Sequence, residues 1–483
     1  MSTKRKVVAW ILVAILALIG ILAFLLTPNR ADVPLLAVTG KDPQLTAPEA
    51  ETVPTMGVAK PIGWKANEVP QAAKGLAVTR FADGLVHPRT LYTLPNGDVL
   101  VALTNRPDNG PGGITGLVMN WLFRRAGADT PSPNQIVLLR DTDHDGRADQ
   151  RSVLTGAVKS PGGMAWRDGT LYVGDSAALV AFPYQLGQTR IDGAPKKLMD
   201  LPGGGMHWMR NVALSPDGKR IYVSVGSSSN VAEGGIDKEQ GRAAIWEYNL
   251  VNGSSRIFGG GMRNPNGMAF NPWTGELWTV VNERDMLGPD IVPDYLTNVP
   301  IGANYGWPWV YWGNNFDDRV DAPQPSGFNP AYIRKPQFAL GPHVAALGLV
   351  FSGAGARMGA DYASGAFIAE HGSWNRQPLS GYQVVYVPFD KNGNPVGKPQ
   401  PVLGGFLTSK DDTHGRPTWL TWAGDGALLV SDDTAGIIWR VIAPGAQPQA
   451  AIAKLKGESL PPQRELHGLD ASFGEEHAIV VPR

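Results

Sequence analysis

GMAWRDGTLYV, at residues 163–173, is one copy of a pattern that occurs six times in this chain of 483 residues. Each copy has a short apolar run, a tight turn with glycine, and a second run rich in β-forming residues. The six turns are Asn96-Gly97, Asp168-Gly169, Asp217-Gly218, Thr274-Gly275, Ser364-Gly365 and Asp425-Gly426. Asp-Gly and Asn-Gly favour hairpins because such turns need positive φ angles. Repetition at intervals of tens of residues predicts an all-β, six-bladed β-propeller, because one blade alone cannot bury both of its faces.

The composition fits this fold and excludes several classes of function. The chain has 59 Gly and 40 Pro for turns, and 15 Trp and 12 Tyr for stacked sheets. Its formal net charge is zero with 18% charged residues, so no basic footprint for nucleic acid is present. Cysteine is absent, which excludes disulfides, thiolate metal sites, thiol nucleophiles and covalently attached c-type haem.

The N-terminus carries an apolar run from Val7 to Leu26, preceded by Lys4, Arg5 and Lys6. About 20 apolar residues can cross the ~30 Å hydrocarbon core as one helix. The basic flank places the N-terminus in the cytoplasm and everything after Pro28 outside. We expect an uncleaved single-pass anchor in the inner membrane over residues 1–27, with the rest of the chain in the periplasm. The alternative is a cleaved signal peptide, although no clear small-x-small cleavage site follows the run.

The remaining chain divides by composition. Residues 28–75 are rich in Pro, Ala, Thr and Val and predict a tether, residues 76–445 carry the propeller, and residues 446–483 form a tail. Two gaps in the repeat, at about 107–133 and 282–342, exceed ordinary blade loops, and long loops on such a fold are usually functional. Within the first, residues 114–125 predict a helix that either packs on a blade or touches lipid.

An acidic loop between two repeats has the spacing of a calcium site. Its carboxylates are Asp141, Asp143, Asp145 and Asp149, and Gly146 permits the sharp turn. The carboxylate expected at the twelfth position of an EF-hand is missing, because Ser152 stands there. The sequence predicts a structural Ca²⁺ site, and the alternative is a solvated acidic turn.

Four residues before inner strands are candidates for chemistry. His207 follows a glycine run at 203–205, where a ligand can approach closely, and a neutral imidazole suits proton abstraction near pH 7. Arg210, Arg263 and Arg416 precede the inner strands of three repeats, and equivalent positions converge on the channel mouth. Converging guanidinium groups favour a bound anion with planar carboxylates. The alternatives are a structural histidine and arginines that pair with neighbouring acids.

Several blocks resemble the soluble quinoprotein glucose and sorbosone dehydrogenases. They are His207 with residues 215–218, residues 262–270, Asn282-Glu283, residues 304–308 and residues 371–376. The resemblance covers about residues 80–440, and residues 371–376 bring it closest to the sorbosone branch. It implies a six-bladed propeller that binds pyrroloquinoline quinone (PQQ) over the channel, with a Ca²⁺ that polarises the cofactor.

The resemblance also implies roles for individual residues. His207 would take the proton of the anomeric hydroxyl, Arg263 and Asn264 would hold the quinone carbonyls, and Arg416 would hold a carboxylate. The chain departs from the family at Arg284-Asp285-Met286, where the glucose dehydrogenases supply calcium ligands from Gln-Gly-Pro. Asp285 and Gly288 are the expected region of that metal. Arg376 would replace a cofactor-binding lysine, and Thr418 stands in place of a second arginine.

These observations favour a membrane-tethered PQQ-dependent dehydrogenase that oxidises an aldose or aldosone and passes electrons to an external acceptor, a quinone or a cytochrome. A metal-dependent propeller lactonase is the enzymic alternative, but it needs a carboxylate-rich channel where this chain places arginines. A propeller that serves only as a binding scaffold is the non-enzymic alternative. The sugar cannot be deduced, because substrate-contacting loops are the variable part of such folds.

Overall fold

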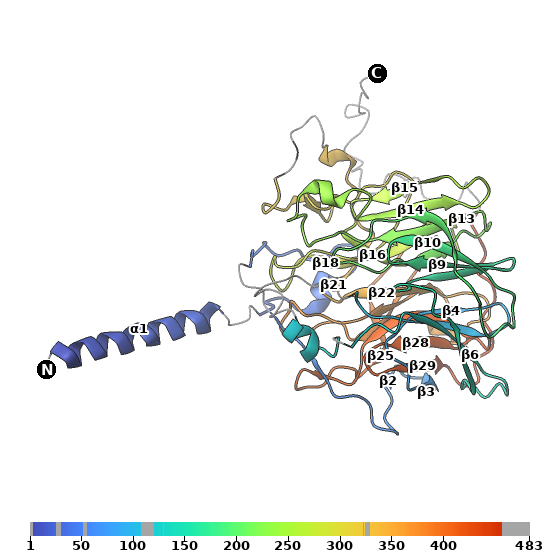
Figure 1. Cartoon of the computed structure of the whole chain (residues 1–483), viewed down its shortest axis with the longest axis horizontal. Coiled ribbons are helices and arrows are strands. Elements are labelled where there is room, and N and C mark those ends of the chain that lie inside the picture. The colour runs from blue at the N-terminus through green and yellow to red at the C-terminus, as the bar shows by residue number, and fades with distance from the viewer. Residues whose placement is uncertain are drawn as a thin grey trace, which may run out of the picture.

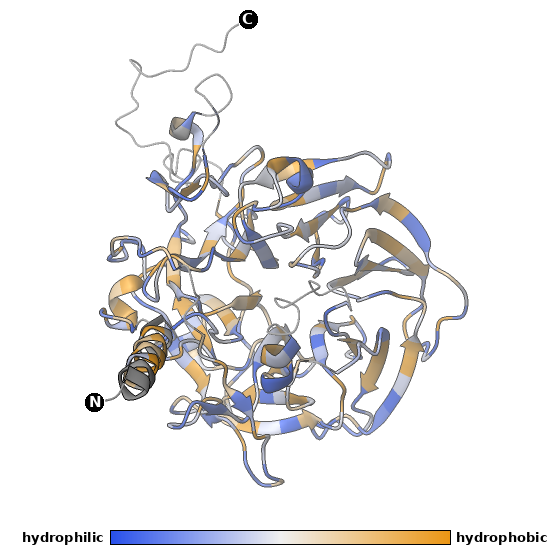
Figure 2. Ribbon diagram, turned by 60° about the vertical axis from the view of Figure 1, so that its left-hand side comes forward, coloured by the Kyte–Doolittle hydropathy of each residue, from blue (hydrophilic) through white to orange (hydrophobic). Residues whose placement is uncertain are grey.

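The protein is a six-bladed β-propeller whose sheets stand round a central axis (Figures 1 and 2). The computed structural model describes residues 3–25, 30–51, 56–107, 120–128, 130–321, 323 and 329–455. The first blade contains β4 (Pro88–Thr93), β5 (Val99–Leu103), β6 (Gln135–Arg140) and β7 (Gln150–Thr155). The second contains β8 (Met164–Arg167), β9 (Thr170–Asp175), β10 (Ala178–Pro183) and β11 (Lys196–Asp200). The third contains β12 (Val212–Leu214), β13 (Arg220–Val225), β14 (Ala244–Asn249) and β15 (Ser255–Gly260).

The other three blades have the same antiparallel order, and the last is closed by an N-terminal strand. The fourth blade contains β16 (Asn264–Phe270), β17 (Leu277–Asn282), β18 (Pro293–Asn298) and β21 (Phe338–Pro342). The fifth contains β22 (Ala346–Phe351), β23 (Gly365–Glu370), β24 (Gln383–Pro388), β25 (Gln400–Gly404) and β2 (Gln71–Ala72). The sixth contains β27 (Pro417–Trp422), β28 (Leu428–Asp432), β29 (Ile437–Ile442) and β3 (Ala77–Ala82). Because β3 pairs with β29, main-chain hydrogen bonds join the two ends of the propeller and close the ring.

Each predicted turn lies between the first two strands of a blade, so the repeat is confirmed. Five of the six glycines have positive φ, from +64° at Gly218 to +91° at Gly97. Gly365 is the exception, since it begins β23. A Cβ there would lie 2.4 Å from the carbonyl oxygen of Val387 and 2.5 Å from the ring of Tyr386, so this glycine is needed for space.

The apolar core lies between neighbouring blades. One cluster joins Leu100 and Ile136 of the first blade to Leu171, Val180 and Phe182 of the second, and all of these side chains are buried. Strand side chains alternate between the two faces of a sheet, so each blade buries one face against each neighbour. The stacked sheets therefore form a rigid frame that holds the loops at both ends of the channel.

The segment predicted to be a tether lies on the propeller instead. β1 (Lys60–Pro61) pairs with β26 (Asp412–Thr413), and β2 extends the fifth blade. Trp64 stacks on His414 with ring centroids 4.6 Å apart, and it packs into the cluster that contains Trp439. The segment that predicted a tether by its Pro, Ala, Thr and Val content thus packs on the propeller, and its strand β2 covers the outer strand of the fifth blade.

The N-terminal helix α1 (Thr3–Leu25) extends away from the propeller (Figure 1). Its described side chains from Trp10 to Ile21 are exposed. Among the helices in the described part of the chain, none has the combination of length and apolar character that crossing a bilayer requires.

Both long gaps and the tail are partly described. In the first gap, residues 120–125 are helical, and residues 108–119 lie outside the described ranges. The second gap contains β19 (Val310–Tyr311), β20 (Asn315–Phe316) and the 3₁₀ helix η3 (Pro330–Tyr332). At the C-terminal end, the Leu455 amide donates to the carbonyl of Trp273, and Gln449 exchanges main-chain hydrogen bonds with Gly355 and Ala356, so the described part of the tail lies against the hairpin turns of two blades.

Candidate active site

The candidate residues gather at one end of the channel because they follow or precede strands at the same end of each blade. His207 lies between β11 and β12, Arg263 precedes β16, Asp285 follows β17, His371 follows β23, and Arg416 precedes β27. In an antiparallel sheet the first strand starts where the second strand ends, so these positions share one face. The hairpin turns lie on the opposite face.

His207 is a neutral imidazole whose tautomer is set by its neighbour. Its Nδ1 lies 2.9 Å from both the carbonyl and the hydroxyl oxygen of Ser227. A carbonyl oxygen only accepts, so the ring proton is assigned to Nδ1 and Nε2 is an acceptor. Burial, followed by the positive charge of Arg263, lowers the pKa of His207 to about 3. Nε2 of the ring is therefore unprotonated at neutral pH.

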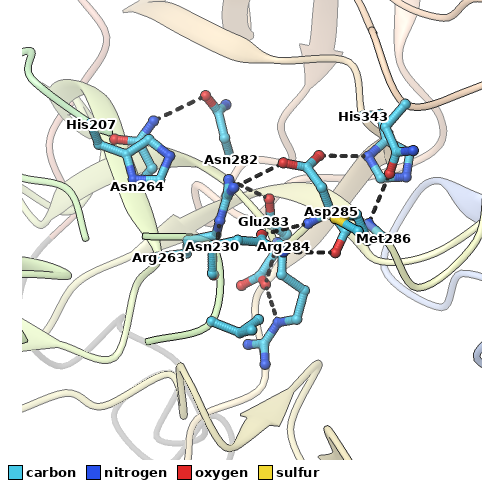
Figure 3. A network of polar contacts seen from close by, with 12 residues as sticks. His207, Asn230, Arg263, Asn264, Asn282, Glu283, Arg284, Asp285, Met286 and His343 are labelled. Atoms are coloured by element: carbon cyan, nitrogen blue, oxygen red, sulfur yellow. Dashed lines mark hydrogen bonds and ion pairs between the residues drawn. The ribbon is translucent and has the colours of Figure 1, made fainter. Parts of the chain in front are cut away.

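Asn264 stands beside His207 because a glycine leaves room for both. A Cβ at Gly226 would lie 2.5 Å from the Cβ of His207 and 2.3 Å from Oδ1 of Asn264. The Asn264 amide donates to Oδ1 of Asn282 at 3.4 Å, and Asn282 itself donates to the carbonyl of Ala346 at 2.7 Å. Two partly exposed amides, of Asn264 and Asn282, thus lie beside the imidazole (Figure 3).

Next to them lies a largely buried chain of charges that joins Arg263 and Asp285 to His343, a residue that was not predicted (Figure 3). Arg263 Nη2 lies 2.8 Å from Oδ2 of Asp285, and His343 Nδ1 lies 3.2 Å from Oδ1 of the same carboxylate. His343 Nε2 lies 3.1 Å from the carbonyl of Gly288. Both partners of His343 are acceptors, so both ring nitrogens donate and the ring is an imidazolium. Burial opposes this charge, but the hydrogen bond to Asp285 raises the pKa of His343.

The hydrogen bonds of this network involve the same oxygen atoms of Asp285 and Gly288 that were expected to bind the calcium ion beside PQQ. The carboxylate of Asp285 is shared by Arg263 and His343, and the carbonyl of Gly288 accepts from His343. The carbonyl of Asp285 accepts from Asn230 and Arg319. Two cations already adjoin the carboxylate, so the prediction of a calcium site at Asp285 and Gly288 does not fit these residues.

A second cluster on the same face is more basic. His371 Nε2 lies 3.0 Å from Oδ1 of Asp433, which also pairs with Arg89, and Arg416 donates to the carbonyls of His371 and Gly372 at 3.0 Å. Burial, followed by Arg416, lowers the pKa of His371 to about 4, so this ring is neutral. Two guanidinium groups face one carboxylate here, and the excess positive charge suits a carboxylate ligand.

Some of these residues could have been found from the sequence and others could not. Arg89 is the second residue of β4, the inner strand of the first blade, whereas Arg263 and Arg416 directly precede β16 and β27. Its place at the start of an inner strand could have identified it. His343 and Asp433 belong to no motif that was recognised. Their place in the site depends on chain segments that only the fold brings together.

Two predicted cofactor residues have other partners. Arg210 is fully buried and donates to the carbonyls of Pro202, His207 and Met209, so it supports the His207 loop from below. Arg376 is 3% exposed and pairs with Asp290 at 3.1 Å. Both guanidinium groups are buried, and their Nη atoms bind groups within the protein, while the Nε atom of each is buried without a hydrogen-bond partner. Arg263 is also 3% exposed and acts through Asp285.

The acidic loop is on the opposite face, between β6 and β7. Carboxylate oxygens of Asp141, Asp143 and Asp149 lie within 4.8 Å of one another, and Oδ1 of Asp141 is buried without a hydrogen-bond partner. Asp145 lies outside this group of three and accepts from the amide of Arg147 at 2.7 Å. Three of the four predicted ligands are thus brought together, and among the described residues this is the one such group of three or more acidic or metal-binding side chains.

Comparison with known families settles the relationship. The TrAA12-like family model matches residues 128–295 and 328–443, more than half of the chain. The chain belongs to the TrAA12-like family. This TrAA12-like protein is 26% identical over 437 residues to the pyrroloquinoline quinone-dependent pyranose dehydrogenase of Coprinopsis cinerea, a match that covers 78% of this chain and 55% of that protein.

One further protein is similar in sequence, and one solved structure is similar in fold. An uncharacterised protein of Borreliella burgdorferi is 31% identical over 239 residues, which is 49% of this chain and 60% of that protein. The calcium structure of the Trichoderma reesei carbohydrate-active enzyme of family AA12 superposes with a TM-score of 0.61 at 21% identity, over 77% of this chain and 96% of that one. The latter likeness shows the propeller fold. The TrAA12-like protein spans 60% of the length of the Borreliella burgdorferi protein and 55% of the length of the Coprinopsis cinerea protein.

Proposed function

We propose that this TrAA12-like protein is a PQQ-dependent dehydrogenase that oxidises an aldose or aldosone sugar. The observation that carries the proposal is a neutral, partly buried His207 facing the same mouth as a cluster with excess positive charge at Arg89 and Arg416. The named pyranose dehydrogenase of Coprinopsis cinerea supports the same chemistry.

The residues at the mouth fit PQQ by their chemistry. The Arg89 and Arg416 cluster would hold carboxylates, and the amides of Asn264 and Asn282 would donate to carbonyl oxygens. When bound, PQQ supplies a two-electron acceptor. His207 Nε2 would accept the proton of the sugar hydroxyl, while Ser227 fixes the orientation of the ring. Because Asp285 already pairs with Arg263 and His343, a calcium ion at Asp285 takes no part in this proposed reaction. Electrons would then leave to an external acceptor, a quinone or a cytochrome.

Binding of PQQ is tested by titrating the apoprotein and following the absorbance of the cofactor. We expect saturation at one PQQ per chain, and a rise in melting temperature with PQQ concentration because a ligand of the folded state stabilises it. A scaffold protein or a lactonase would show neither change.

We also propose that Ca²⁺ occupies the acidic loop and stabilises the fold without taking part in chemistry. Three clustered carboxylates repel one another unless a cation lies between them, and Asp141 has a buried oxygen without a partner. At a hundredfold excess over Kd, bound Ca²⁺ would add about 2.7 kcal/mol to the free energy of unfolding.

The Ca²⁺ proposal predicts that Asp143→Ala lowers the melting temperature in calcium and leaves turnover at lower temperature unchanged. The measurement is a melting curve with Ca²⁺ and with chelator. In chelator the two proteins should melt close together. Equal melting curves for both proteins in both buffers would exclude a calcium site in this loop.

A third part of the proposal places the protein at the inner membrane, with its propeller in the periplasm. It rests on the apolar run Val7–Leu26 and its basic flank. The amide of Ala31 donates to the carbonyl of Gln377 at 2.7 Å, so the chain that follows α1 meets the propeller on the face that carries His207.

Membrane attachment predicts that the intact protein sediments with membranes and that deletion of residues 1–28 releases it into the soluble fraction. Immunoblots of fractionated cells provide the measurement. Soluble protein whose N-terminus lies beyond Leu26 would show a cleaved signal peptide instead.

A further inference from the structure

The backbone segment Asp285–Gly288 has an irregular shape that other parts of the chain hold in place. Met286 has a φ of +69° and Gly288 a φ of +111°, so two of its four residues are left-handed. The amide and carbonyl of Asp285 bind the side chain of Asn230 at 2.9 and 3.0 Å, and Arg319 donates to the carbonyls of Asp285 and Met286 at 2.9 and 3.1 Å. A left-handed non-glycine residue persists where its surroundings over-determine it.

The N-terminal strap, residues 31–51 and 56–57, supplies further bonds to this segment and to the neighbouring loop at 371–378. The amides of Glu49 and Glu51 donate to the carbonyls of Leu287 and Met286 at 2.8 and 3.1 Å. The amide of Gly57 donates to the carbonyl of Trp374 at 2.7 Å. A Cβ at Gly57 would lie 2.5 Å from the Gln377 side chain, so the strap lies flat on that loop.

Glu51 and Asn375 connect the strap to the segment through side chains. Asn375 is fully buried, its Oδ1 accepts from the Met286 amide at 2.8 Å, and its Nδ2 donates to Oε2 of Glu51 at 2.8 Å. An amide side chain can face either way, but a carboxylate only accepts hydrogen bonds. Glu51 therefore fixes the orientation in which Asn375 offers its oxygen to Met286.

We propose that the strap is a built-in part of the active site, and that Glu51 and Asn375 are positioning residues for Asp285–Gly288. By holding Met286, they keep the Asp285 carboxylate between Arg263 and His343. The charge of Arg263 is in turn one of the causes that keep His207 neutral. Of the two tests below, only the second rests on the proposed function.

The first test is amide hydrogen exchange of peptides that cover residues 284–290, measured by mass spectrometry without cofactor. Glu51→Ala and Asn375→Ala are expected to speed exchange there by ~10-fold or more, because the hydrogen bond to the Met286 amide opens more often. Glu51→Gln should behave as wild type, since its amide oxygen can still accept from Asn375. Asp42→Ala is the matched control, because Asp42 is an exposed strap carboxylate that pairs with Lys335.

Unchanged exchange in Glu51→Ala and Asn375→Ala would overturn the proposal, and so would an equal change in Asp42→Ala. The second test is kcat for sugar oxidation by the same variants with saturating PQQ, measured with a dye acceptor. We expect a ~10–100-fold fall in kcat for Glu51→Ala and Asn375→Ala, because Asp285 and Arg263 no longer hold their places beside His207, and no change for Glu51→Gln. Wild-type kcat values in both alanine variants would also overturn the proposal. If the wild type binds no PQQ, the proposed function fails and the exchange measurement still decides the role of the strap.

Discussion

Replacing His207 by alanine is expected to lower kcat for sugar oxidation by ~10²–10⁴-fold, the usual contribution of a positioned general base. The PQQ titration should remain close to wild type, because Arg89 and Arg416 are untouched. Burial lowers the pKa of His207 to about 3, so the ring stays neutral and kcat should not fall through its protonation over roughly pH 5–8.

Ser227→Ala is the matched control for this prediction. It removes the hydroxyl near Nδ1 and keeps the carbonyl that fixes the tautomer, so kcat should change far less. Steady-state kinetics with an artificial dye acceptor measure both variants. Near wild-type turnover in His207→Ala would show that another group removes the proton.

Replacing Asp433 by alanine is expected to reduce the free energy of unfolding by about 3–5 kcal/mol, the usual cost of removing one partner from a buried ion pair. Its side chain is 7% exposed and lies against Arg89 and His371. Burial opposes the charge, but His371 and Arg89 hold the pKa of Asp433 well below its usual range. Without the carboxylate, Arg89 and His371 would lose the partner that they share.

Urea unfolding provides the measurement for Asp433→Ala. Asp192→Ala is the control, because Asp192 forms an ion pair with Arg190 in which both side chains are more than three-quarters exposed. Exposed pairs contribute little, so this variant should unfold near the wild-type midpoint. Similar midpoints for the two variants would contradict the buried network described for the second cluster.

The fold could be predicted because its determinants are local. An Asn-Gly or Asp-Gly turn specifies a hairpin by itself, and four such turns with two further glycine turns, at intervals of tens of residues, leave few architectures open. The strap could not be predicted, because main-chain hydrogen bonds such as those from Glu49 and Glu51 leave no pattern in side-chain types. Composition at 28–75 therefore suggested a tether where the structure has a packed segment.

The site was predicted in part, for a related reason. His207 stands out because a glycine run and an inner strand flank it. Arg210 and Arg263 look equivalent in sequence, yet Arg210 is enclosed by carbonyls and Arg263 by Asn230 and Asp285. What a guanidinium binds depends on its depth, and depth at a propeller mouth is set by neighbouring blades that are distant in sequence. His343 was missed for the same cause.

The most direct test of the central claim is sugar-dependent reduction of an artificial electron acceptor by the purified protein, before and after addition of PQQ. A panel of aldoses and aldosones serves as substrate, and His207→Ala serves as the matched inactive protein. We expect no turnover without PQQ. With PQQ we expect saturable turnover that reaches its maximum at one PQQ per chain and requires His207. Absence of turnover on every sugar despite bound PQQ, or turnover independent of PQQ, would contradict it.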